Sequence, residues 1–104
     1  MHARMARYAF VGDPRELAQL AEAEVVPFLQ GQPGFKSYSL TDSNGEIISF
    51  SIWDTQEQAE EASAAIANWV TDRIGDRVEL KETRLGEVLL STALGVHATA
   101  GASA

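Results

Sequence analysis

The side chains of this sequence that could do chemistry are phenolic hydroxyls and guanidinium groups on segments where apolar and polar residues alternate. Tyr8 and Tyr38 could each give a hydrogen bond to an oxygen of a bound molecule or exchange a proton with it. Arg7 and Arg84 could neutralise an anionic ligand in a pocket of low dielectric. Each has a plainer interpretation, because a tyrosine often keeps its hydroxyl at a wet rim and a strand arginine often pairs with a glutamate.

Composition excludes several other chemistries. The chain has no cysteine, which removes thiolate metal sites, iron–sulfur clusters, disulfides and cysteine nucleophiles. Its histidines, His2 and His97, stand alone, and the sequence holds no metal-ligand cluster, nucleophile elbow, phosphate-binding glycine loop or repeat. We therefore expect no metal site.

Length and charge limit the partners. The 104 residues form one domain, and 15 acidic against 8 basic residues give a net charge of −7. That charge repels nucleic-acid phosphates and anionic headgroups, so we expect neither nucleic acid nor membrane as a partner. No apolar run approaches the roughly 20 residues of a membrane span, and residues 1–11 lack the apolar region of a secretory signal. We expect a cytoplasmic protein.

The elements that must position these side chains are centred on residues 33–54. Two alternating segments meet at Asn44-Gly45, a pair that tolerates positive φ, and together they predict an antiparallel hairpin. One face of the second segment is entirely apolar and predicts core: it carries Ile48, Phe50 and Ile52. The other face is mixed and predicts the lining of an interface or a cavity: it carries Ile47, Ser49, Ser51 and Trp53.

A helix is predicted on each side of the hairpin. The first begins at Pro14, with Asp13 as its N-cap, and ends by Gly31. The second begins after Asp54 and ends at Gly75, which is expected in the left-handed conformation. The inward stripe of the first helix is predicted to be Leu17, Leu20, Ala21, Val25 and Phe28; the capping box of the second is predicted to be Asp54 with Glu57.

A strand is predicted outside each helix. Residues 5–11 form the first, and residues 78–90 form a bent last strand with a bulge at Gly86. Residues 1–4 are interpreted as an N-terminal extension. Residues 91–104 are rich in Ala, Ser, Thr and Gly and predict a tail that only packing on a partner subunit would order.

The predicted order is strand, helix, strand, strand, helix, strand. This is the split βαβ pattern of an α+β, ferredoxin-like domain, in which both helices cover one face of an antiparallel four-stranded sheet. The other face of the sheet is uncovered. Whichever of the two alternating sets of side chains of the second hairpin segment it carries, this face exposes apolar residues. We therefore expect a homodimer in which two sheets pack face to face.

Four stretches resemble a known family. They are Val26-Pro27-Phe28-Leu29, Gln32-Pro33-Gly34-Phe35, Ser49-Phe50-Ser51-Ile52-Trp53-Asp54 and Gly86-Glu87-Val88-Leu89. Over residues 5–90 the chain resembles the antibiotic biosynthesis monooxygenase domain, whose fold is a dimeric α+β barrel. That group includes cofactor-free oxygenases of phenols, haem-degrading enzymes and small-molecule-binding proteins. The haem-degrading branch carries a histidine on its second helix, and this sequence has none there.

The resemblance implies roles for particular residues. The cofactor-free branch uses aromatic and amide side chains, between sheet and helices, to orient a phenol that itself reduces dioxygen. By this resemblance Tyr8 and Trp69 are the candidate catalytic residues, and Tyr38, Trp53, Asn68 and Arg84 are the candidate substrate-binding residues. Ordinary core packing is the alternative for both tryptophans.

The expected function is cofactor-independent oxidation of a small phenol-like or polyketide-like aromatic. The alternative is a non-catalytic dimer of the same fold that binds a small hydrophobic molecule. If side chains fill the space between the layers, neither ligand hypothesis holds, whereas an open apolar pocket with polar groups supports both.

Overall fold

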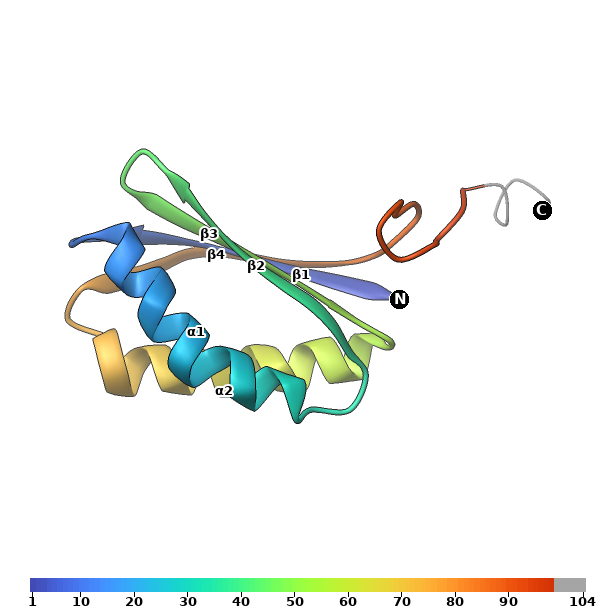
Figure 1. Cartoon of the computed structure of the whole chain (residues 1–104), viewed down its shortest axis with the longest axis horizontal. Coiled ribbons are helices and arrows are strands. Elements are labelled where there is room, and N and C mark those ends of the chain that lie inside the picture. Colours follow the sequence, from blue (N-terminus) through green and yellow to red (C-terminus); the bar gives the residue numbers. More distant parts are fainter. Residues whose placement is uncertain (99–104) are drawn as a thin grey trace.

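Two helices cover one face of a four-stranded antiparallel sheet (Figure 1). The computed structural model describes residues 1–98. The elements are β1 (His2–Phe10), α1 (Pro14–Gln30), β2 (Phe35–Ser43), β3 (Glu46–Trp53), α2 (Gln56–Ile74) and β4 (Val78–Glu87). The strand order is β2-β3-β1-β4, with every neighbouring pair antiparallel. The predicted ferredoxin-like fold is confirmed.

The hairpin between β2 and β3 turns where the sequence predicts it. Asn44 has φ of 47° and Gly45 has φ of 87°, and the register closes on Ser43 opposite Glu46. Positive φ at two successive turn residues matches the right-handed twist of the strands on either side.

The apolar face of β3 does not form the predicted core, whereas the mixed face lies under the helices, where Ile47 and Ser49 line a cavity, one of its two predicted alternatives. The buried side chains that face the helices are Ile47, Ser49, Ser51 and Trp53. The apolar set Ile48, Phe50 and Ile52 lies on the uncovered face, where Phe50 is 45% exposed. The helices supply leucine, isoleucine and tryptophan from their own side of the layer, so small serines on the sheet are compatible with a well-packed core.

Helix α1 has the predicted limits and a slightly different buried stripe. The Asp13 carboxylate accepts a hydrogen bond from the Arg15 backbone N–H at 2.9 Å, and the helix ends before Gly31. Its buried residues are Leu17, Ala21, Val25 and Leu29. Phe28, predicted to face inward, is 43% exposed, because burial follows a strict four-residue spacing that reaches Leu29 instead.

Helix α2 begins one residue later than predicted. Thr55 is the N-cap: its Oγ1 accepts from the Gln58 N–H at 3.2 Å, while Gln58 Oε1 accepts from the Thr55 N–H at 3.1 Å. The predicted box of Asp54 with Glu57 is therefore wrong by one position. Gly75 ends the helix with φ of −59°, in the right-handed and not the predicted left-handed conformation.

The outer strands also differ from the prediction. β1 starts at His2, so residues 2–4 belong to the sheet and are not an extension of it. β4 ends at Glu87, and its irregularity lies where Arg7 and Tyr8 pair with it, not at Gly86. The extra residue there is Lys81 on β4, so β1 keeps its regular alternation and Tyr8 stays on the same face as Arg4 and Ala6.

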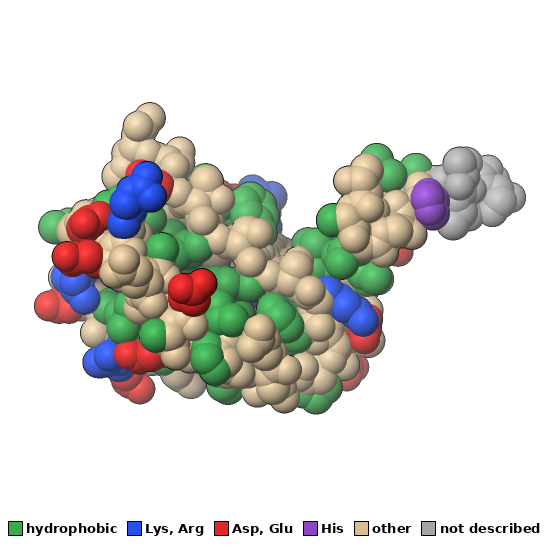
Figure 2. Space-filling view, in the orientation of Figure 1, with side chains coloured by type: hydrophobic (Ala, Val, Ile, Leu, Met, Phe, Trp, Pro, Cys, Tyr) green, Lys and Arg blue, Asp and Glu red, His purple; other side chains and the backbone are tan. Residues whose placement is uncertain are grey.

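Residues 88–98 leave the sheet and run beyond the domain (Figures 1 and 2). Leu89, predicted to continue a buried strand, is 72% exposed, and the backbones of Ser91 and Val96 bond to each other. Packing of this segment on a partner subunit stays a prediction, and residues 99–104 lie outside the described residues. On the face shown in Figure 2 the charged side chains gather mainly at the end away from this segment.

Gly34 supplies a specific stability test. Its φ is +77°, and a Cβ there would lie 1.9 Å from Gln58 Oε1, within the α2 capping box. Gly45 has a similar φ of +87° but would meet nothing within 4 Å. Gly45→Ala should therefore cost only the backbone term of about 1 kcal/mol, whereas Gly34→Ala should cost about 1–2 kcal/mol more through loss of the cap. Urea denaturation of both variants measures the difference, and equal midpoints would contradict it.

Candidate functional site

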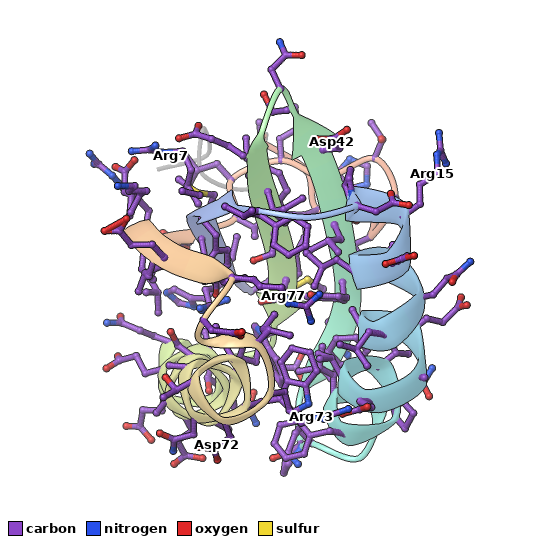
Figure 3. All side chains as sticks on the ribbon, turned by 90° about the vertical axis from the view of Figure 1, so that its left-hand side faces the viewer. Arg7, Arg15, Asp42, Asp72, Arg73 and Arg77 are labelled. Carbon is purple, nitrogen blue, oxygen red and sulfur yellow. The ribbon has the colours of Figure 1, made fainter. Side chains whose placement is uncertain are left out.

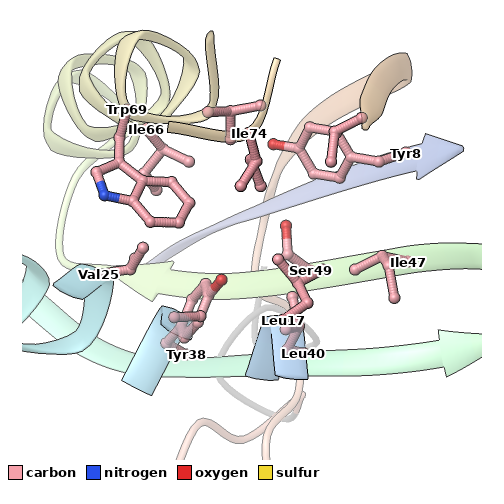
Figure 4. Close-up of a pocket in the computed structure, with 13 residues that line it drawn as sticks. Tyr8, Leu17, Val25, Tyr38, Leu40, Ile47, Ser49, Ile66, Trp69 and Ile74 are labelled. Atoms are coloured by element: carbon pink, nitrogen blue, oxygen red, sulfur yellow. The ribbon is translucent and has the colours of Figure 1, made fainter. Parts of the chain in front are cut away.

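A pocket lies between the two helices and the sheet (Figure 4). Its walls are mainly apolar: Leu17, Ala21, Val25, Leu40, Ile47, Ile66, Val70, Ile74 and Val78, with Tyr8, Tyr38, Ser49 and Trp69. About 430 Å³ of atom-free space, continuing into solvent, lies among these residues, of which about 30 Å³ is open to the centre of a water molecule. A volume of about 30 Å³ has room for about one water molecule, so an aromatic ring can enter only if the side chains of the walls move apart.

Three hydroxyls from three strands point into this space (Figure 4). Tyr8 comes from β1, Tyr38 from β2 and Ser49 from β3. Because Ser49 pairs with Ala6 on one side and with Leu40 on the other, it is the diagonal neighbour of both tyrosines. The sheet thus brings two predicted site residues together with Ser49, which was predicted only to lie on a face that lines an interface or a cavity.

The Ser49 hydroxyl is buried and has no hydrogen-bond partner. Leaving a buried hydroxyl without a partner costs free energy, so native structures rarely do it without a reason. Here the group faces an apolar pocket that can hold a molecule with a polar atom. In the sequence this serine stands in a strand segment whose alternate positions are the apolar Ile48, Phe50 and Ile52, and that pattern could have identified it.

Burial raises the pKa of Tyr38 to about 12. Desolvation is the main cause; the neighbouring Tyr8 adds to it, and the positive charge of Arg4 acts in the opposite direction. Tyr38 is therefore a neutral hydroxyl at physiological pH and can donate a hydrogen bond to a ligand.

Trp69 covers the pocket and is held by a carboxylate from the other helix. Its Nε1 donates to Glu24 Oε1 at 3.2 Å, and Arg73 donates to the same carboxylate at 2.7 Å and 2.5 Å. Figure 3 shows Arg73 between the two helices. The hydrogen bond from Arg73 is the largest cause that holds the pKa of Glu24 below its ordinary value. Glu24 lies outside the predicted inward stripe of α1, so this bridge was not predicted from the sequence.

The structure does not bring the other predicted residues to the pocket. Trp53 is fully buried elsewhere in the core, where its Nε1 donates to Ser51 Oγ at 2.9 Å and its ring meets Phe35 edge-on at 5.3 Å. Asn68 is exposed on α2.

Arg84 lies on the uncovered face of the sheet, opposite Met5 in the strand register. It pairs at 2.6 Å with Glu82, a glutamate two residues away on the same strand.

Metal and membrane sites receive no support within residues 1–98. No group of three or more histidine, aspartate and glutamate residues there could hold a metal ion. In the same part of the chain, neither helix has the length and apolarity needed to cross a bilayer.

The fold is that of the antibiotic biosynthesis monooxygenases. SnoaB, a cofactor-independent oxygenase from Streptomyces nogalater, superposes with a TM-score of 0.67 at 18% identity over 88% of this chain and 95% of its own. The ActVA-Orf6 monooxygenase of Streptomyces coelicolor, solved with nanaomycin D, gives 0.62 at 16% identity over 86% and 92%. A further antibiotic biosynthesis monooxygenase gives 0.65 at 13% identity over 86% and 100%.

No protein-family model matches the sequence. No curated protein matches it either. At these identities the solved structures establish the fold, and the activity has to be argued from the site.

The bridge to Trp69 predicts a pH dependence of stability. Because the pKa of Glu24 is lowered from 4.5 in the folded protein, its stabilising contribution is complete above that value and is lost as the pH falls through the lowered folded pKa. Glu24→Gln should therefore be less stable than the parent protein at neutral pH and approach it under acid conditions. Thermal unfolding of both proteins across this range measures the difference, and a constant difference would contradict the assignment.

Proposed function

We propose that the chain is a cofactor-independent monooxygenase of a small aromatic substrate, which binds in the pocket beneath Trp69. The observation that carries the proposal is the unpartnered, buried Ser49 hydroxyl, which faces an otherwise apolar cavity together with two tyrosine hydroxyls. Apolar walls suit a ring, and a few convergent hydroxyls suit a phenolic oxygen. The fold shared with oxygenases such as SnoaB supports the same conclusion.

In this proposal the protein supplies position and polarity, and the substrate supplies electrons. Tyr8 donates a hydrogen bond to the reacting oxygen, and Tyr38 orients the substrate ring from the adjoining wall. Trp69 packs on the substrate ring and holds it against the sheet. A phenol with a free para position is converted by one dioxygen to a quinone and one water. The O–H and para C–H bonds break, a new C=O bond forms, and the second oxygen atom leaves as water.

The alternative function is non-catalytic binding of a small hydrophobic molecule. It is favoured by the absence of carboxylates, histidines and lysines from the residues that line the pocket. Both functions need the pocket to admit a ring, and only one of them consumes oxygen. Binding without oxygen uptake would therefore assign the alternative.

The activity is tested with 1-naphthol as the probe. We expect oxygen uptake matched by formation of 1,4-naphthoquinone, which absorbance detects. Tyr8→Phe and Trp69→Phe should each lower the rate by about 100-fold, the usual scale for a lost proton donor or a misplaced substrate. Gln19→Ala, on the exposed side of α1, should not change it. Parental turnover by both aromatic variants would refute these roles.

We further propose that the protein is a homodimer joined through the uncovered sheet face. Phe50 is 45% exposed there, and its apolar neighbours on that face are Met5, Ile48 and Ile52. Ion pairs of Arg7 with Glu46 at 2.7 Å and of Arg84 with Glu82 at 2.6 Å neutralise charges on the same face. A two-sheet sandwich would remove this apolar surface from water.

Two phenylalanines of nearly equal exposure test the dimer. Phe50→Glu should produce a monomer, because it places a charge in the centre of the proposed interface. Phe28→Glu changes a side chain that is 43% exposed on α1, and the dimer should persist. Size-exclusion chromatography with light scattering measures both, and a monomeric parent protein at micromolar concentration would contradict the proposal.

A further inference from the structure

Arg4 is a charged side chain in the interior of the domain. It is 2% exposed and points from β1 towards the helices. Its Nε donates to Ser63 Oγ on α2 at 2.7 Å, and its Nη2 lies 3.4 Å from the Tyr8 hydroxyl oxygen. An arginine guanidinium stays charged in proteins, so a full positive charge is buried beside the pocket.

No carboxylate within residues 1–98 forms an ion pair or hydrogen bond with Arg4; Glu87, opposite His2 in the register, is the carboxylate nearest to it in the strand pairing and is exposed. Within residues 1–98 the ion pairs involve other arginines and lysines, and none includes Arg4. Its neighbours across the sheet are Ser51 on β3 and Leu85 on β4, and the next side chain on its side of β1 is His2. A buried charge without a counter-charge is costly.

The Arg4 charge connects to the pocket through Tyr8. Because the Tyr8 oxygen faces the Arg4 Nη2 donor, its own O–H is free to donate elsewhere, and Figure 4 shows it pointing into the pocket. Ser49 adds an unpartnered hydroxyl on the same wall. The charge of Arg4 also extends to Tyr38, where it opposes the rise in pKa that burial causes. The pocket therefore combines hydroxyl donors with one positive charge behind them.

We propose that Arg4, Tyr8 and Ser49 form a subsite for the ionised oxygen of a phenolic ligand, which binds as its phenolate. Tyr8 and Ser49 donate to the phenolate oxygen, and Arg4, acting through Tyr8, is a positioning residue that supplies the counter-charge. The proposal rests on the proposed function, because it requires the pocket to bind an aromatic ring. It adds that the bound form is the anion.

The test uses 4-nitrophenol, whose ionised form is yellow, and its neutral methyl ether 4-nitroanisole. A spectroscopic pH titration of bound 4-nitrophenol should give an apparent pKa about one unit below that of the free compound, equivalent to about tenfold tighter binding of the phenolate. 4-Nitroanisole should bind about tenfold more weakly than the phenolate. Arg4→Met and Tyr8→Phe should each abolish the shift in pKa.

Arg15→Met is the matched control, since it removes one positive charge from an exposed side chain that points away from α1 (Figure 3). It should leave the shift intact. Arg4→Met should also keep or raise the unfolding temperature, because it removes an unbalanced buried charge. If Arg4→Met does not fold, Tyr8→Phe by itself tests whether the pKa shift of bound 4-nitrophenol depends on this subsite.

The failures are distinguishable. Equal binding of the two probes with no pKa shift would overturn the phenolate subsite and leave the aromatic pocket standing. Binding of neither probe would overturn both proposals. If Tyr8→Phe kept the full shift in the pKa of bound 4-nitrophenol, the claim that Arg4 acts through Tyr8 would be overturned.

Discussion

The alternation of side chains along β3 is the constraint on which the rest of the structure depends. It turns Ser49 and Ser51 towards the helices and Ile48, Phe50 and Ile52 away from them. Small residues under the helices leave space and place hydroxyls there: Ser51 accepts the hydrogen bond of the buried Trp53 indole, and Ser49 remains unpartnered at the pocket. The same period of two gathers the apolar side chains on the bare face. One strand thus determines both the proposed ligand site and the proposed dimer interface.

The helices complete the pocket through polar contacts as well as packing. Glu24 of α1 accepts hydrogen bonds from Trp69 and Arg73 of α2, so the carboxylate that joins the helices also fixes the indole over the cavity. On the opposite wall Arg4 is bonded to Ser63 and faces Tyr8. The negative charge of Glu24 is already neutralised by Arg73, whereas no carboxylate within residues 1–98 pairs with Arg4. This asymmetry leaves one positive charge without an ion-pair partner behind Tyr8, at the sheet side of an otherwise apolar pocket.

Much of this architecture could be predicted from the sequence, because it depends on local signals. The Asn44-Gly45 turn, the Asp13 cap with Pro14 and the alternation of the strands were sufficient for the fold. The site was only partly predictable. Hydrophobicity alone placed the more apolar face of β3 in the core. This was wrong because the helices supply large apolar side chains to the core, and the pattern of the strand does not show that. Arg4 was missed because an arginine near a chain end reads as exposed, and its burial depends on residue 63 from a distant helix.

The central claim is that an aromatic molecule binds between the helices and the sheet, where the space now open to water is only about 30 Å³. A crystal structure of the protein with 1-naphthol tests it most directly. The account predicts the ring between Trp69 and the sheet, with its oxygen within hydrogen-bond distance of the Tyr8 and Ser49 hydroxyls and the wall side chains moved apart to admit it. A structure at saturating 1-naphthol in which the pocket stays closed, or in which the molecule binds elsewhere, would contradict the account.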